Sequence, residues 1–148
     1  MSSDKIYVDP SALARLFIHQ EGSKEMSDWR RRLNGPLSVT HHGRTEIINA
    51  IGLAAFRGMT TVEDANAAWQ ELEQEFIDGN FKQADLLWRA ALNRAGNLSW
   101  KYSAKLGTRS LDVLHVSCAL ELQMTHLLSF DERQNQLAEA VGIKGIVF

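Results

Sequence analysis

The sequence is poor in cysteine and proline, and it contains no long apolar run. Its 148 residues include one cysteine and two prolines. A single cysteine excludes an internal disulfide and any cysteine-rich zinc site. No apolar segment approaches the roughly 20 residues that a membrane-spanning helix needs, and the first residues show no signal-peptide pattern. We therefore expect one soluble, cytoplasmic domain over residues 1–148, with no membrane contact.

The chain also lacks an excess of charge of either sign. Sixteen lysines and arginines against eighteen acidic residues give a formal net charge of −2. This balance argues against a protein that holds nucleic acid through bulk positive charge. Hydrophobic residues make up 45 % of the chain and charged residues 23 %, a composition that argues against disorder.

Short β-branched or aromatic runs alternate with helical patterns along the chain. The runs that predict strands are residues 5–8, 37–40, 126–130 and 145–148. Apolar residues at helical spacing predict helices near residues 13–17, 26–33, 47–56, 62–76, 84–96, 110–122 and 131–141. Strands separated by helices are typical of a parallel sheet that is covered on both faces. The sequence therefore predicts an α/β fold, a three-layer α/β/α sandwich with a short parallel sheet.

Local signals set the expected boundaries of the central helices. Glu46 is expected to open the helix over residues 47–56, and Thr60 with Glu63 forms a capping-box pattern before the next one. Gly96-Asn97 is expected to end the helix that starts near residue 84. The amphipathic stripe of the 62–76 helix is expected to be mostly core, and it consists of Val62, Ala65, Trp69, Leu72 and Phe76.

Four acidic residues lie where ligands bind in a parallel α/β sheet. Asp9 and Asp131 each follow a predicted strand, and ligands bind outside the carboxyl ends of such strands. Glu46 and Asp112 lie near the starts of predicted helices. If these starts face the same sheet edge, four carboxylates converge and repel one another, and a hard divalent cation offsets that repulsion. Oxygen ligands suit Mg²⁺, and such an ion activates water and neutralises a phosphate.

Two of these acids also fit as helix caps. Asp9 followed by Pro10 fits an N-cap with proline at the first helical position. Asp131 with Gln134 three residues later resembles a capping box. Taken alone, neither residue distinguishes a cap from a metal ligand.

The other two acids have structural alternatives as well. Glu46 alone is typical of a solvated helix residue. Asp112 interrupts an apolar helix, and Asp is rarely buried without a partner. Its alternative role is a contact with the positive end of the helix dipole, paired to Arg109. The set of four acids, rather than any one of them, indicates a metal site.

Four segments resemble, in the same order, the successive motifs of PIN-domain nucleases. They are Tyr-Val-Asp-Pro-Ser-Ala-Leu at 7–13, Thr-Glu-Ile at 45–47, Arg-Ser-Leu-Asp-Val-Leu-His at 109–115 and Leu-Ser-Phe-Asp-Glu at 128–132. The small size of the chain is similar to that of VapC-type toxins of bacterial toxin–antitoxin pairs. This resemblance implies an Mg²⁺- or Mn²⁺-dependent endoribonuclease that hydrolyses RNA phosphodiester bonds and is restrained by a cognate antitoxin of a VapBC-type pair. Separately, any exposed part of the apolar 62–76 helix could bind an antitoxin helix or a second copy of the chain in a homodimer.

The resemblance also implies roles for individual residues. It assigns metal-ligand and catalytic roles to Asp9, Glu46, Asp112 and Asp131. Ser11 and Ser129 become supporting hydroxyls, and Ser129 keeps the hydroxyl of the threonine that is frequent there in the family. Pro10 is a less usual neighbour of the first acid, although the acid itself is preserved.

Several other residues have both a functional and a structural interpretation. Lys101, Lys105 and Arg109 could meet RNA phosphates or form a solvated face, and Arg109 is favoured because it adjoins the predicted site. His115 is expected to be a core histidine bonded to Asp112 or another acid, and Cys118 an inert core residue.

Two other function classes compete with the nuclease. The first is a catalytically silent PIN-like interaction module, in which the acids are structural and an apolar helix face binds a partner. The second is a phosphoacceptor receiver domain. A receiver needs paired acids after its first strand and a lysine at the end of a late strand, whereas Asp9 stands beside Pro10 and Lys144 precedes the last predicted strand. The retention of all four acids favours the nuclease.

Overall fold

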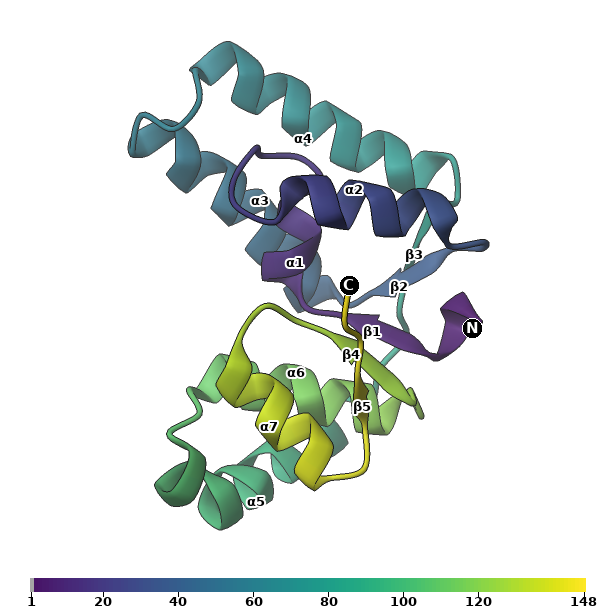
Figure 1. Ribbon diagram of the computed structural model, residues 1–148, viewed down its shortest axis with the longest axis vertical. Helices are drawn as coiled ribbons and strands as arrows, with labels where there is room; N and C mark the ends of the chain where they lie inside the picture. Colours follow the sequence, from purple (N-terminus) through teal and green to yellow (C-terminus); the bar gives the residue numbers. More distant parts are fainter. Residues whose placement is uncertain (1) are drawn as a thin grey trace. The chain divides into compact units, whose positions relative to one another are not determined.

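The computed structural model describes residues 2–148, which form two compact units (Figure 1). The first unit contains residues 2–4, 10–84 and 148, and the second contains residues 5–9 and 85–147. Each unit has its own parallel sheet. None of the helices formed by residues 2–148 has the length and apolar character needed to cross a bilayer.

The first unit is a two-stranded parallel sheet with four helices. Leu37 lies opposite Phe81 and Val39 opposite Gln83 in the pairing of its two strands. Two parallel strands need a long connection. Here two helices of sixteen residues each form that connection. In chain order its elements are α1 (Pro10–Ala14), α2 (Ser23–Arg32), β2 (Leu37–Val39), α3 (His41–Phe56), α4 (Val62–Ile77) and β3 (Phe81–Gln83).

Every helix of the first unit buries apolar side chains. The Phe81 ring packs edge-on against Phe17 and Phe76, with ring centroids 6.0 and 5.7 Å apart. Each fully buried side chain of this size stabilises the fold by about 1.5–3 kcal/mol. The largest fully buried side chains of this unit are Leu13, Met26, Leu37, Ile47, Leu72 and Phe81.

The second unit is built on a three-stranded parallel sheet in the order β1-β4-β5. Ile6 pairs with His126 and Val8 with Leu128. A short 3₁₀ helix, η1 (Ser3–Lys5), precedes β1. The elements of the unit are β1 (Ile6–Val8), α5 (Trp88–Leu106), α6 (Ser110–Glu121), β4 (His126–Leu128), α7 (Glu132–Ala140) and β5 (Lys144–Gly145).

Helix α6 is the buried centre of the second unit. Every residue from Val113 to Ala119 is buried, which confirms the interpretation of its all-round apolar pattern. The α6 helix packs on α5 and α7. The hydroxyl of Ser117 donates a 2.6 Å hydrogen bond to the Ala91 carbonyl of α5, so the polar group inside this interface is satisfied.

The α/β fold with short parallel strands is confirmed, but two helix starts differ from the prediction. Helix α3 begins at His41, because the Thr40 hydroxyl accepts a 2.8 Å hydrogen bond from the Gly43 amide. Glu46 therefore lies in the second turn of α3 rather than at its start. Helix α4 is capped by Thr61, one residue later than the capping-box pattern indicated.

The structure departs from the sequence prediction at two points between residues 81 and 107. Strand β3 was not predicted, because Phe81-Lys82-Gln83 contains a single apolar residue. Helix α5 does not end at Gly96-Asn97 but runs on to Leu106, where Gly107 ends it with a φ of 69°. Packing of Leu98, Tyr102 and Leu106 against the core beyond Gly96 outweighs the local glycine signal.

The apolar stripe of α4 is only partly core. Leu72 is fully buried and its neighbour Ala68 nearly so, whereas Val62 is 66 % and Trp69 46 % exposed. The expectation that this stripe is mostly core is wrong at Val62 and Trp69.

Candidate functional site

The second unit brings three of the four predicted acids to one edge of its sheet. Asp9 follows β1 directly, and Asp131 comes three residues after the last residue of β4. The Asp9 amide donates a 3.0 Å hydrogen bond to the Leu128 carbonyl, so the segments that follow β1 and β4 leave the sheet side by side. Asp112 lies in the first turn of α6. Asp9 and Asp131 thus lie at the carboxyl ends of two adjacent parallel strands, where α/β proteins bind ligands.

Gln134 on α7 contacts all three acidic residues. Its Nε2 donates to Asp9 Oδ1 at 3.0 Å and to the backbone carbonyl of Asp112 at 3.1 Å. Its backbone amide donates to Asp131 Oδ1 at 2.9 Å. The Gln134 side chain is fully buried, so it holds three separate segments of the chain in a fixed arrangement.

Sequence reasoning recognised Gln134 only as the partner of a helix cap. The cap is confirmed, since Asp131 accepts the hydrogen bond from the Gln134 amide. The wider role was missed, because it depends on a contact with Asp9 across 125 residues. Among residues 2–148, the buried Oε1 of Gln134 has no hydrogen-bond partner. The Nε2 group must face the two acceptor oxygens, so Oε1 remains available as an acceptor for a water or a ligand.

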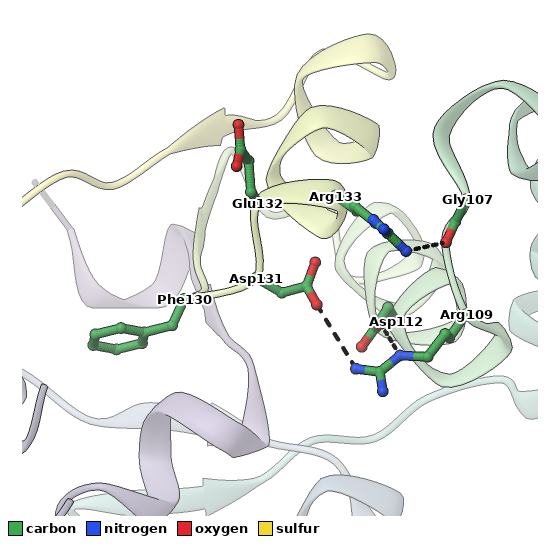
Figure 2. Close-up of a pocket in the computed structure, with 7 residues that line it drawn as sticks. All are labelled: Gly107, Arg109, Asp112, Phe130, Asp131, Glu132 and Arg133. Atoms are coloured by element: carbon green, nitrogen blue, oxygen red, sulfur yellow. Dashed lines mark hydrogen bonds and ion pairs between the residues drawn. The ribbon is translucent and has the colours of Figure 1, made fainter. Parts of the chain in front are cut away.

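Arg109 lies between two of the carboxylates at a pocket of about 390 Å³ (Figure 2). Its Nε is 3.3 Å from Asp112 Oδ2 and its Nη2 is 3.7 Å from Asp131 Oδ2. The Arg109 side chain is 80 % exposed, and ion pairs in such settings contribute little stability. A ligand can therefore displace the Arg109 guanidinium from these two carboxylates at a small cost in free energy. The pocket is lined by Gly107, Arg109, Asp112, Phe130, Asp131, Glu132 and Arg133.

Burial and neighbouring carboxylates both act on the pKa of Asp112. Burial, followed by the carboxylate of Asp131, raises the pKa of Asp112; Arg109 opposes this shift, and Asp9 adds to it. When the pKa of a carboxyl is higher in the folded than in the unfolded state, the fold becomes less stable as the pH rises from the unfolded-state pKa to the folded-state pKa. Ionised Asp112 therefore destabilises the metal-free fold, and a bound cation would reverse the sign.

Ser129 orients Asp131 through the backbone. Its hydroxyl accepts a 3.0 Å hydrogen bond from the Asp131 amide. Its carbonyl accepts a 2.9 Å hydrogen bond from Asn135 Nδ2. The Ser129 hydroxyl thus helps to hold the turn between β4 and α7, and its supporting role in the site stays a prediction.

Two predicted site residues belong to the first unit. Ser11 is an exposed residue of α1, and its carbonyl accepts a 2.7 Å hydrogen bond from Arg15. Glu46 on α3 pairs with His42, with Oε1 and Nε2 2.7 Å apart. Their convergence with the acids of the second unit stays a prediction.

The remaining candidates on α6 are core residues. His115 is buried, and its Nδ1 lies 2.6 Å from the hydroxyl of Tyr7 on β1. The core position is as predicted, and the hydroxyl of Tyr7 is a partner that was not foreseen. Cys118 is fully buried with a free thiol, as expected.

Comparison with known proteins adds an independent observation. Residues 6–140 match the family described as the PIN domain, a range that includes strands β1 to β4 and all the acids of the site. No curated protein matches the chain.

Proposed function

The chain belongs to the PIN domain family, and from this premise we propose that it is a metal-dependent endoribonuclease that hydrolyses RNA phosphodiester bonds. PIN domains are generally nucleases. The observation that carries the proposal is the grouping of Asp9, Asp112 and Asp131 around Gln134 at the carboxyl edge of a parallel sheet.

The donor groups at this edge fit a hard divalent cation. Carboxylate oxygens are preferred by Mg²⁺ and Mn²⁺. The pKa of Asp112 is raised first by burial and then by the neighbouring carboxylates of Asp131 and Asp9, whereas Arg109 opposes the shift. We propose that Asp9, Asp112 and Asp131 hold the ion. Following the sequence resemblance, we add Glu46 as a fourth acid and Ser11 and Ser129 as supporting hydroxyls.

When bound, such an ion supplies Lewis acidity toward a phosphodiester and toward water. The protein's own groups position the reactants. Gln134 fixes the orientation of the Asp9 carboxylate. Arg109 lines the pocket, and its exposed guanidinium can bind a phosphate instead of the carboxylates of Asp112 and Asp131. The pocket-lining residues within 2–148 include no serine, threonine, cysteine or histidine, so we expect water rather than a side chain to attack the phosphorus.

Metal removal tests this proposal. The wild-type protein with Mg²⁺ or Mn²⁺ is expected to cleave a radiolabelled single-stranded RNA, and excess EDTA is expected to abolish the cleavage. Adding Mn²⁺ beyond the EDTA should restore it, as measured by product bands on a denaturing gel. Cleavage that persists at full rate in EDTA would contradict the metal mechanism.

We further propose that the protein is the toxin of a VapBC-type pair and is restrained by a cognate antitoxin. The order of the four motifs and the small size of the chain support this role. Co-expression with the product of the neighbouring small gene is expected to yield a complex that co-purifies and lacks RNase activity. A chain that stays unbound and fully active beside that product would refute the pairing. A complex without any RNase activity in the separated chain would favour the silent interaction module.

A further inference from the structure

The outward surface of α5 carries basic side chains and no acidic ones. The nineteen residues of this helix include two arginines and two lysines, all exposed, and no aspartate or glutamate. Arg94 is paired with Glu121, 2.7 Å away. Within residues 2–148, no carboxylate forms an ion pair with Arg89, Lys101 or Lys105. In a chain of net charge −2, this helix is a local site of positive charge.

Trp100 lies at the centre of this surface. It is 91 % exposed, and at about 100° per residue it points opposite to the buried Ala91. The same geometry places Arg89, Asn93 and Asn97 on the side of Trp100. An indole that is left in water gives up the stabilisation that burial would provide. We call this surface the α5 face, and it consists of Arg89, Asn93, Gly96, Asn97 and Trp100, with Lys101 at its edge about 100° around the helix from Trp100.

Gly96 is a second, independent feature of the α5 face. It lies one turn before Trp100 in the interior of a helix, where glycine is less stable than alanine by about 1 kcal/mol. No packing requires it, because a Cβ at Gly96 would meet no atom within 4 Å. Helical side chains lean toward the preceding turn, so the absence of a side chain at Gly96 leaves one face of the indole open to a planar group.

We propose that the α5 face binds a single-stranded segment of RNA, with one base stacked on Trp100 and phosphates at Arg89 and Lys101. Every base has a π-face that stacks on an aromatic side chain, and basic side chains supply the charge that the backbone requires. The inference rests on the proposed nuclease function, since it names the surface that presents the substrate.

The α5 face leads directly to the candidate active site. Gly107, which ends α5 seven residues after Trp100, lines the pocket together with Arg109. At 1.5 Å per helical residue, Trp100 lies about 10 Å along the chain from this pocket rim. All of these residues belong to the second unit, so a bound strand can contact the face and the pocket at once.

Binding of a fluorescein-labelled twelve-nucleotide oligo(U), followed by anisotropy in EDTA, tests the inference without cleavage. Trp100→Ala is expected to raise the Kd about 5- to 150-fold, and Trp100→Phe should keep most of the affinity because a phenyl ring still stacks. The double variant Arg89→Ala/Lys101→Ala should reduce the slope of log K against log salt by about 1.4. Matched controls are Phe56→Ala, which removes an aromatic side chain that is 87 % exposed, and Lys82→Ala/Lys144→Ala, which removes two exposed lysines.

Gly96→Leu separates binding from folding. Leucine is a good helix former at an exposed position with free space, so the melting temperature should rise by about 2–4 °C. The same side chain would cover the open face of Trp100, so the Kd for oligo(U) should rise as it does in Trp100→Ala. Loss of affinity in a more stable protein cannot be ascribed to misfolding.

Unchanged oligo(U) affinity in Trp100→Ala would overturn the inference, and so would equal displacement of oligo(U) by poly-glutamate, which would indicate an acidic protein partner. These outcomes are distinct from failure of the nuclease proposal. RNA cleavage by Trp100→Ala with the KM of the wild type would refute RNA binding by the α5 face, and the nuclease proposal would stand. RNA binding that depends on Trp100, without cleavage at any metal concentration, would refute the nuclease proposal, and RNA binding by the α5 face would stand.

Discussion

Asp9→Asn is expected to lower the rate of metal-dependent RNA cleavage by more than about 100-fold. Even substitutions of residues that hydrogen-bond to metal ligands lower metal affinity or activity by about 10–100-fold. The substitution removes one carboxylate charge from a site proposed to hold a divalent ion, while it keeps the shape of the side chain. Initial rates on a radiolabelled RNA at saturating Mn²⁺ measure the effect. Asp85→Asn removes an exposed carboxylate elsewhere in the second unit and should leave the rate unchanged.

The same substitution should not destabilise the metal-free protein. Asn caps a helix about as well as Asp, and its Oδ1 can still accept the hydrogen bond from Gln134. Asp9 is only 5 % exposed and adds to the repulsion that raises the pKa of Asp112. Removing its charge should therefore leave the melting temperature equal or higher. Full cleavage by a stable Asp9→Asn protein would refute the catalytic role of this residue.

Gln134→Leu is expected to impair both stability and cleavage. It removes the Nε2 donor from the buried Asp9 carboxylate and from the Asp112 carbonyl. A buried acceptor that loses its donor costs about 1–3 kcal/mol, and more when the acceptor is charged. Because the three acids lose their common support, the cleavage rate should fall by about 10–100-fold. Urea unfolding and the Mn²⁺ dependence of the rate measure the two effects.

Gln136→Leu provides the matched control, because Gln136 is exposed on the same helix and should tolerate leucine without loss of activity. A purely structural role of Gln134 predicts a different result. The folded fraction of Gln134→Leu would then cleave at the wild-type rate with an unchanged requirement for Mn²⁺, and the positioning role would be wrong.

The sequence located the parts of the site that depend on local pattern. Asp9 and Asp131 stand at the ends of apolar strands, and the all-round apolar pattern of α6 marks Asp112 as an acid in a buried helix. Parallel pairing of β1 with β4 then brings the chain segments together. These features follow from periodicity and from the rule for sheet edges.

What the sequence could not provide depends on contacts between distant segments. Gln134 occupies an ordinary third helical position, and only its hydrogen bond across 125 residues identifies its role. Strand β3 holds a single buried residue and is defined by its partner β2. Similarly, packing against α6 carries α5 through Gly96, so the face around Trp100 was hidden by an expected helix end.

The central claim is that Asp9, Asp112 and Asp131 form a divalent-cation site, and the melting temperature with and without Mn²⁺ tests it most directly. A ligand at 100 times its Kd stabilises the folded state by about 2.7 kcal/mol. The account predicts that Mn²⁺ raises the melting temperature of the wild-type protein and has much less effect on Asp9→Asn, with EDTA reversing the difference. An equal shift in both proteins, or none in the wild type, would contradict it.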